Sequence, residues 1–112
     1  RILIIKRKKT DNNLLWAFPG GKAETEETPE NAVTREIMEE TGVRVQVMKH
    51  LGTRKHPQTS AEISYFLCRF VFQINRLAED EVEEIRWCGK DEIFSLFTTE
   101  IFPPVSELLN LL

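Results

Sequence analysis

Short apolar runs alternate with polar breaks along the chain, a pattern that predicts β-strands. The runs predicted as strands are Ile2–Lys8, Leu14–Phe18, Val43–Leu51, Ile63–Ile74 and Ile85–Cys88. The run from Ile63 is rich in aromatic and β-branched residues and is partly apolar on both faces, which is typical of a strand inside a sheet. The polar segment Gly52–Ala61 predicts a break or hairpin before it.

Three segments predict helices. The longest begins at Pro29, because Thr28 can cap the first turn and proline at the first helical position loses no hydrogen bond. It ends before Gly42, since glycine adopts the left-handed conformation of a helix end at least cost. Asp91–Phe97 predicts a short helix, and Pro103 opens a last one. Strands interleaved with helices predict an α/β domain with a mixed β-sheet between helices.

Composition adds limits on partners and compartment. The chain has 112 residues, 41% hydrophobic and 29% charged, which is ordinary for one globular domain spanning residues 1–112. Its net charge of −3 gives no reason to expect a nucleic-acid polymer or a membrane as partner. No apolar stretch reaches membrane-spanning length and no signal peptide is evident, so a cytoplasmic location is expected. Cys68 and Cys88 lie in apolar runs without metal-ligand spacing and are expected to be buried thiols.

Three carboxylates fall within five residues of the long helix, at Glu36, Glu39 and Glu40. Residues three and four apart share a helix face, and like charges at this spacing destabilise a bare helix. A hard divalent cation such as Mg²⁺ takes oxygen ligands and would reverse the repulsion. Glutamate-rich helix faces are also common as solvated surface, so the carboxylates alone leave both interpretations open.

The residues around these carboxylates extend the pattern. Gly21, Glu27, Arg35-Glu36, Glu39-Glu40 and Gly42-Val43 stand at the spacing of the Nudix box, with every defined position present. The approach to it, WAFPGGK, is also similar to that of MutT-like members. The chain therefore resembles the Nudix hydrolases. The resemblance implies an α/β/α sandwich, in which another strand usually precedes the point where this sequence begins.

The same resemblance implies a divalent metal, Mg²⁺ or Mn²⁺, and attack of water on a nucleoside diphosphate linked to a further group X. The positions that match metal ligands are Gly21, Glu36, Glu39 and Glu40. Arg35 and Glu27 match supporting positions, where an ion pair between them would hold the ligand helix to the preceding loop. Glu27 could also be an ordinary solvated loop residue.

The catalytic candidates are Glu36, Glu39, Glu40 and, outside the box, Glu81. Glu81 lies six residues before Trp87, a spacing that resembles MutT-type members, and Glu84 is the second choice from the same acidic run. Most of that run is expected to be solvated. Which glutamate deprotonates the water stays open, because its pKa depends on metal distance and burial.

The substrate-binding candidates are Lys22, Arg7, His56 and Ser106. Lys22 matches a family lysine near the phosphates, and Arg7 ends the first strand within reach of them or of solvent. His56 lies in the polar loop where related hydrolases build their pocket, although a lone histidine there is usually a surface residue. Ser106 stands where MutT-type members have a base-reading asparagine, and it lacks the amide that pairs with a purine edge. This departure counts against 8-oxo-dGTP.

Three functions remain open. The small size favours a compact substrate, a nucleoside triphosphate cut to monophosphate and pyrophosphate. An ADP-ribose or nucleotide-sugar pyrophosphatase is the alternative within the same chemistry, with Pro57 as a weak marker. The third is a catalytically silent nucleotide-binding domain, against which the intact box argues. The expected partner is a small nucleotide, and the resemblance also leaves a homodimer open.

Overall fold

The computed structural model describes residues 1–8, 16–21, 23–56, 61–75 and 82–112. Its elements are β1 (Ile2–Arg7), β2 (Trp16–Ala17), α1 (Pro29–Thr41), β3 (Val43–Lys55), β4 (Glu62–Gln73), β5 (Val82–Cys88), α2 (Lys90–Leu96) and α3 (Pro103–Asn110). The predicted α/β class is confirmed. Among the described residues, no helix has the length and apolar character that crossing a bilayer requires.

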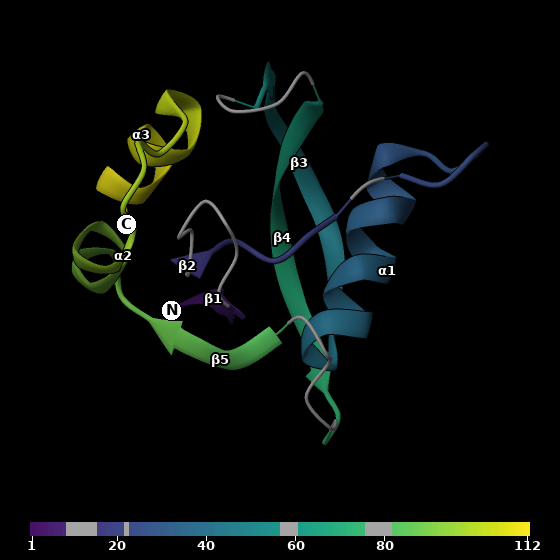
Figure 1. Ribbon diagram of the computed structural model, residues 1–112, viewed down its shortest axis with the longest axis horizontal. Coiled ribbons are helices and arrows are strands. Elements are labelled where there is room, and N and C mark those ends of the chain that lie inside the picture. Colours follow the sequence, from purple (N-terminus) through teal and green to yellow (C-terminus); the bar gives the residue numbers. More distant parts are fainter. Residues whose placement is uncertain (9–15, 22, 57–60, 76–81) are drawn as a thin grey trace.

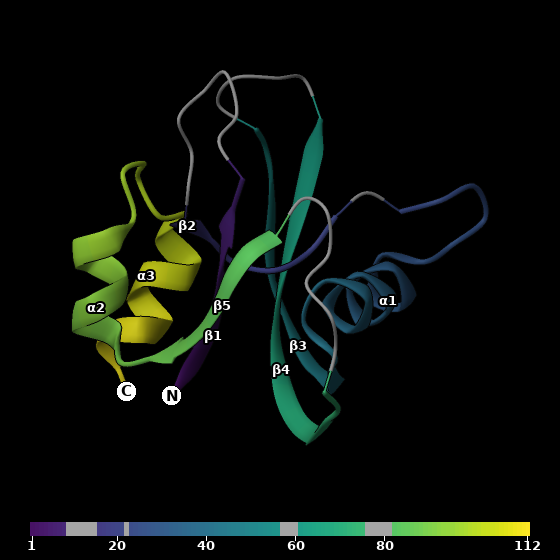
Figure 2. The same cartoon turned by 60° about the horizontal axis from the view of Figure 1, so that its bottom comes forward.

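The strands lie between α1 on one side and α2 with α3 on the other (Figures 1 and 2). The described strands form two sheets, of order β2-β1-β5 and β3-β4. Within each sheet, every pair of neighbouring strands is antiparallel. A mixed sheet was expected from the alternation of strands and helices. Among the described strands no parallel pair is present, so the mixed sheet does not appear in this part of the chain.

Each face of the strand layer carries its own core because successive side chains of a strand point to opposite faces. On β1, Ile4 joins the core beneath α2 and α3, whereas Leu3 packs against the core beneath α1. The buried members of the first core are Ile4, Cys88, Ile93, Val105 and Leu109, and those of the second are Ile37, Val43 and Val45. This division is the sandwich that the sequence predicts.

The ends of α1 agree with the sequence prediction. The Thr28 hydroxyl accepts a hydrogen bond from the Asn31 N–H at 3.1 Å, as an N-cap side chain should. At the other end Gly42 has φ of 76° and donates its N–H to the Met38 carbonyl at 2.9 Å. Both ends are therefore determined by residues within one turn of them.

No loop separates α1 from β3. The Thr41 hydroxyl donates to the Ile37 carbonyl at 2.6 Å and accepts from the Val43 N–H at 3.1 Å, so one buried side chain bridges helix and strand. The Ile74 N–H also bonds the Gly42 carbonyl at 3.0 Å, which ties the end of β4 to the same junction. Helix and hairpin are thus joined at the bottom of the view in Figure 1.

The predicted break at Gly52 is wrong in part, since β3 continues to Lys55. Gly52 pairs with Tyr65 in the β3–β4 ladder at a φ of 156°, a conformation that few side chains allow. A Cβ here would lie 2.8 Å from Cε2 of Phe102, the residue before α3. The absence of a side chain at Gly52 therefore leaves the space in which the Phe102 ring packs.

The position predicted for β4, inside a sheet, is also wrong for the described residues, where β3 is its single strand partner. Its C-terminal half exposes large apolar side chains, namely Leu67, Phe70, Val71 and Phe72, and Ile74 just beyond it. The two cysteines are free thiols, as predicted, and burial raises the pKa of both.

Candidate active site

Glu40 is the most buried of the three helix carboxylates, with 9% of its surface exposed. One oxygen accepts from Arg7 Nη1 at 3.0 Å and the other from the Gly20 N–H at 2.8 Å. Arg7 Nη2 in turn donates to the Gly20 carbonyl at 3.1 Å, which closes a ring of three residues from β1, the loop and α1. Burial raises the pKa of Glu40, while Arg7 and the Gly20 N–H oppose that rise. This network fixes the loop against the last turn of α1.

Arg35 joins the helix to the loop from its other end. Its Nε and Nη2 donate to the two oxygens of Glu27 at 2.8 and 2.9 Å, the fork geometry of a bidentate pair. The predicted ion pair is therefore present. Glu27 also accepts from the Glu24 N–H at 2.9 Å, and the hydrogen bonds from Arg35 lower its pKa to about 2. Glu27 therefore links the loop to α1 at a second place, in addition to the network around Glu40.

The remaining nitrogen of Arg35, Nη1, lies among three further carboxylates. It contacts Glu36 at 2.7 Å, Glu39 at 3.2 Å and Glu24 at 3.7 Å. The contacts with Glu36 and Glu39, after those with Glu27, raise the pKa of Arg35. A positive charge thus already stands where repulsion between the helix glutamates would be greatest.

Gly21 lies directly against Glu36. A Cβ at this position would be 2.6 Å from the Glu36 carboxylate carbon and 2.7 Å from Oε2, closer than atoms can approach. Only glycine lets the Glu36 carboxylate reach the loop backbone. The backbone of Gly20-Gly21 and the carboxylates of Glu36 and Glu40 therefore adjoin one another, and together they form the candidate metal-binding surface.

The donor chemistry of this surface fits a hard divalent cation, because every candidate ligand is an oxygen. Within the described residues, however, no three acidic, histidine or cysteine side chains converge as a preformed metal cluster. Glu40 is held by Arg7, while Glu36 and Glu39 face Arg35 Nη1. A cation bound beside Glu40 by Glu36 and Glu39 would replace Arg35 Nη1 as the counter-ion of these two carboxylates.

Lys22, Glu81 and Pro57 lie outside the described residues. The other predicted residues, Glu84, His56 and Ser106, are placed apart from these carboxylates. Glu84 shares the face of β5 with Cys88, on the α2–α3 side, and pairs with Arg86 at 3.0 Å. It is therefore directed away from α1. His56 is half-buried just beyond the end of β3, where its N–H bonds the Ala61 carbonyl at 2.8 Å.

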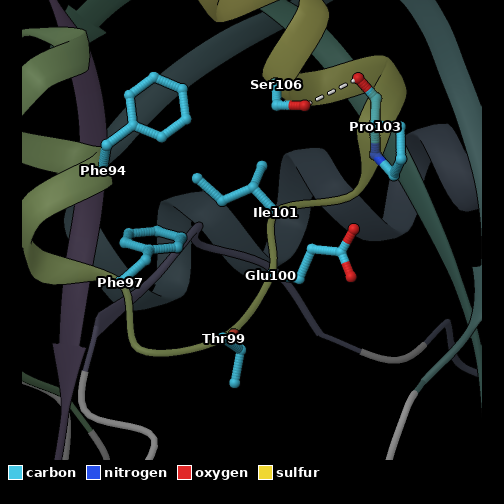
Figure 3. Close-up of a pocket in the computed structure, with 7 residues that line it drawn as sticks. All are labelled: Phe94, Phe97, Thr99, Glu100, Ile101, Pro103 and Ser106. Atoms are coloured by element: carbon cyan, nitrogen blue, oxygen red, sulfur yellow. Dashed lines mark hydrogen bonds between the residues drawn. The ribbon is translucent and has the colours of Figure 1, made fainter.

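Ser106 lies at an open pocket of about 310 Å³ between α2 and α3 (Figure 3). The lining residues are Phe94, Phe97, Thr99, Glu100, Ile101, Pro103 and Ser106. The Ser106 hydroxyl donates to the Pro103 carbonyl at 3.1 Å, so its proton is used within α3 and its oxygen remains an acceptor. Phe97 also contacts Phe18, with ring centroids 4.8 Å apart, and Phe18 leads into the Gly20 loop. The pocket thus adjoins the segment that carries the site.

Sequence reasoning missed the bonds of Arg7 to Glu40 and Gly20. Arg7 was expected to contact phosphate or solvent, and it instead uses two nitrogens inside the protein. The partners are 33 and 13 residues away, so no local pattern could identify them. Trp16 lies beneath the Arg86 guanidinium, whose carbon is 4.7 Å from the Trp16 ring centroid.

Comparison with known proteins gives a consistent picture. The NUDIX domain family matches residues 1–108. A MutT-like protein of Streptomyces ambofaciens is 34% identical over 93 residues, which cover 83% of this chain and 58% of that protein. An 8-oxo-dGTP diphosphatase of Proteus vulgaris is 46% identical over 54 residues, 46% of this chain and 48% of that one. An ADP-ribose pyrophosphatase of Methanocaldococcus jannaschii is 47% identical over 57 residues, 51% and 34% of the two chains.

The chain thus spans about half the length of these relatives. Among solved structures, a MutT NUDIX hydrolase from Burkholderia pseudomallei has a TM-score of 0.70 at 27% identity, covering 96% of this chain and 84% of that one. An Ap4A hydrolase of C. elegans has a TM-score of 0.71 at 17% identity, covering 96% and 80%, and shows the shared fold alone. The predicted sandwich fold is confirmed.

Proposed function

Because this chain belongs to the Nudix family, we propose that it is a hydrolase that cleaves the diphosphate linkage of a nucleoside diphosphate joined to a group X, with Mg²⁺ or Mn²⁺ as cofactor. The observation that carries the proposal is the joining of loop and helix by Glu40 and Arg35. These bonds, with the close contact between Gly21 and Glu36, hold the loop backbone against the glutamates of α1, which supports the proposal.

A bound cation would neutralise the diphosphate and lower the pKa of an attacking water. Glu40, Glu36 and Glu39 would hold it, with the Gly21 carbonyl as a further oxygen. Arg7 and the Gly20 N–H keep the Glu40 carboxylate in one orientation. Arg35 can release Glu36 and Glu39 from Nη1 and still bind Glu27 through its other two nitrogens. The helix then stays attached to the loop while its carboxylates change partner.

The substrate proposed first is a nucleoside triphosphate, cut to monophosphate and pyrophosphate. A relative that matches 83% of this chain is described as MutT-like, and a shorter match, over 46% of it, is an 8-oxo-dGTP diphosphatase. ADP-ribose is the second candidate, because an ADP-ribose pyrophosphatase has the higher identity, 47%, over the region it shares.

The test measures formation of the nucleoside monophosphate with Mg²⁺ or Mn²⁺ from canonical dNTPs, 8-oxo-dGTP, ADP-ribose and nucleotide sugars, together with the second product, pyrophosphate from a triphosphate or a sugar phosphate from the others. Glu40→Gln keeps the side-chain shape and removes its charge, and we expect kcat to fall at least about 10²-fold. Glu30→Gln, the same change at an exposed position in the first turn of α1, should leave turnover unchanged. A chelator should abolish turnover. An inactive wild type across the panel, or equal activity in Glu40→Gln, would contradict the proposal.

A further inference from the structure

Arg7 connects the end of β1 to the carboxylates of α1. Side chains of a strand alternate between its faces, so Arg7 shares a face of β1 with Leu3, which packs against the core beneath α1. Lys6 points to the other face and pairs with Glu83 at 3.5 Å. Glu83 is an additional residue of β5 between the partners of Lys6 and Arg7, where the regular ladder of β1 ends. Of these two adjacent cations, Arg7 is therefore the one directed at α1.

The contact of Arg7 occupies a residue that is also a proposed metal ligand. Arg7 Nη1 lies 3.0 Å from Glu40 Oε2, while Oε1 accepts from the Gly20 N–H at 2.8 Å. A hydrogen bond between an ionised donor and an ionised acceptor is stronger than a neutral one. Whichever oxygen a divalent cation binds, it meets the charge of Arg7, because the two oxygens belong to one carboxylate. Arg7 and a metal ion therefore compete for Glu40.

Arg7 and Arg35 differ in what would hold them once the carboxylates change partner. Arg35 keeps the bidentate pair with Glu27, at 2.8 and 2.9 Å. Arg7 has no second carboxylate within ion-pair distance in the described part of the chain, and its other bond runs from Nη2 to the Gly20 carbonyl at 3.1 Å. These two bonds leave three of the five N–H groups of its guanidinium. Without Glu40, Arg7 is a partly exposed cation that only an anion can neutralise.

Arg7 also lies within reach of whatever the carboxylates of α1 hold. Its Nη1 is one hydrogen bond from Glu40, and its Nη2 is one hydrogen bond from Gly20, next to the glycine that adjoins Glu36. A phosphate oxygen on a metal held by these carboxylates would be one further metal–oxygen bond away, about 2 Å for Mg²⁺. The anion that Arg7 needs and the anion that the substrate brings are therefore at the same place.

We propose that Arg7 exchanges partners: it is the counter-ion of Glu40 while no metal is bound, and it passes to a phosphate of the substrate once Glu40 binds the metal. The inference rests on the proposed function and deepens it. Arg7 is a positioning residue in the free protein and a substrate-binding residue in the complex. Metal and nucleotide are then positively coupled, because the metal frees Arg7 for the phosphate and the phosphate neutralises the charge that opposes the metal.

The first measurement is a calorimetric titration with Mn²⁺ alone, which requires neither nucleotide nor turnover. Arg7→Gln removes the charge and keeps a hydrogen-bonding group, whereas Arg7→Lys keeps the charge and has one nitrogen where the guanidinium uses two. Lys6→Gln is the matched control, because it removes the same charge from the adjacent residue on the opposite face of β1. Thermal unfolding in EDTA checks the fold of each variant.

We expect Arg7→Gln to bind Mn²⁺ about 10-fold more tightly than wild type, because the cation no longer competes with a guanidinium. Arg7→Lys and Lys6→Gln should stay within about 3-fold of wild type, since one keeps the charge and the other removes a charge on the opposite face. A purely structural Arg7 predicts the opposite sign, because a loosened Glu40 would bind Mn²⁺ more weakly. Weaker or unchanged Mn²⁺ binding in Arg7→Gln would overturn the inference.

The second measurement titrates α,β-methylene-ADP, a diphosphate whose P–C–P bridge resists hydrolysis, in Mn²⁺ and in EDTA. Arg7→Gln should weaken its binding about 10- to 100-fold in Mn²⁺ but less than about 3-fold in EDTA, where Glu40 occupies Arg7 in wild type. Arg7→Lys should show the same pattern to a smaller extent, which keeps the test decisive if Arg7→Gln does not fold. Equal losses in both conditions would contradict the exchange. A wild type that binds no nucleotide would refute the proposed function, and the sign of the Mn²⁺ change would still decide whether Arg7 competes for Glu40.

Discussion

Substitution of Gly21 by alanine separates a steric effect on Glu36 from an effect on the fold. The new Cβ would begin 2.6 Å from the Glu36 carboxylate carbon, and ordinary contact requires about 3.4 Å. The carboxylate must therefore retreat from the loop, which disturbs its 2.7 Å ion pair with Arg35. The moving group is the end of a flexible side chain and the φ of Gly21 is not in the left-handed region. The backbone itself has no reason to change.

The magnitudes follow from these contacts. Loss of the partly exposed Arg35–Glu36 pair costs little stability, because solvent screens such a pair. Displacement of a reacting or ligating group by about 1 Å costs about 10²-fold in rate. Gly20→Ala gives the opposite pattern, because a Cβ there meets no atom within 4 Å while its φ of 153° is strained for alanine by about 1–3 kcal/mol.

Urea unfolding, calorimetric Mn²⁺ titration and turnover of the best substrate distinguish the two variants. Gly21→Ala should unfold almost as wild type does, with Mn²⁺ affinity and kcat both reduced. Gly20→Ala should unfold at a lower urea concentration than wild type, because its main effect is on stability. If Gly21→Ala kept wild-type Mn²⁺ affinity and activity, the Glu36 carboxylate could not be a ligand in the position that the structure gives it, and the reasoning would be refuted.

Two further predictions concern the fold of the ligand helix. In Glu27→Gln, the loss of stability relative to wild type should be constant from neutral pH to about pH 5 and should vanish between about 4.5 and 2, because the pKa of Glu27 falls from 4.5 to about 2 on folding and its carboxylate stabilises only when charged. Urea unfolding in EDTA across this range tests it, and a gap that widens in acid would contradict it. Thr28→Ala should lower stability by about 1 kcal/mol through loss of the N-cap bond, whereas Thr28→Ser should retain it, as measured by thermal unfolding.

Features fixed by neighbouring residues were predictable from the sequence. Both ends of α1 depend on residues inside its first and last turns, so Thr28, Pro29 and Gly42 were sufficient. The end of β3 could not be predicted, because glycine at position 52 suggests a break in the strand. The strand continues through Gly52, and the Phe102 ring, just before α3, occupies the space that a side chain would need. The strand partners of β4 could not be derived either. Apolar side chains on both faces of a strand indicate burial but do not identify the element that covers them.

The same distinction applies to the site. The Arg35–Glu27 pair could be predicted because a known box spacing relates the two positions. Arg7 lies on β1, and its contact with Glu40 exists only once that strand and α1 are packed together. A positive charge near a strand end has the same sequence pattern whether it binds protein, substrate or water.

The junction at Thr41 has a consequence for the position of the helix carboxylates. Glu40 directly precedes Thr41, whose hydroxyl is bonded to the helix on one side and to the strand on the other. The place of Glu40 relative to β3 is therefore set by two regular elements joined without a loop, and not by closure of a flexible part. The range of substrates can change through other segments while the carboxylates keep their place.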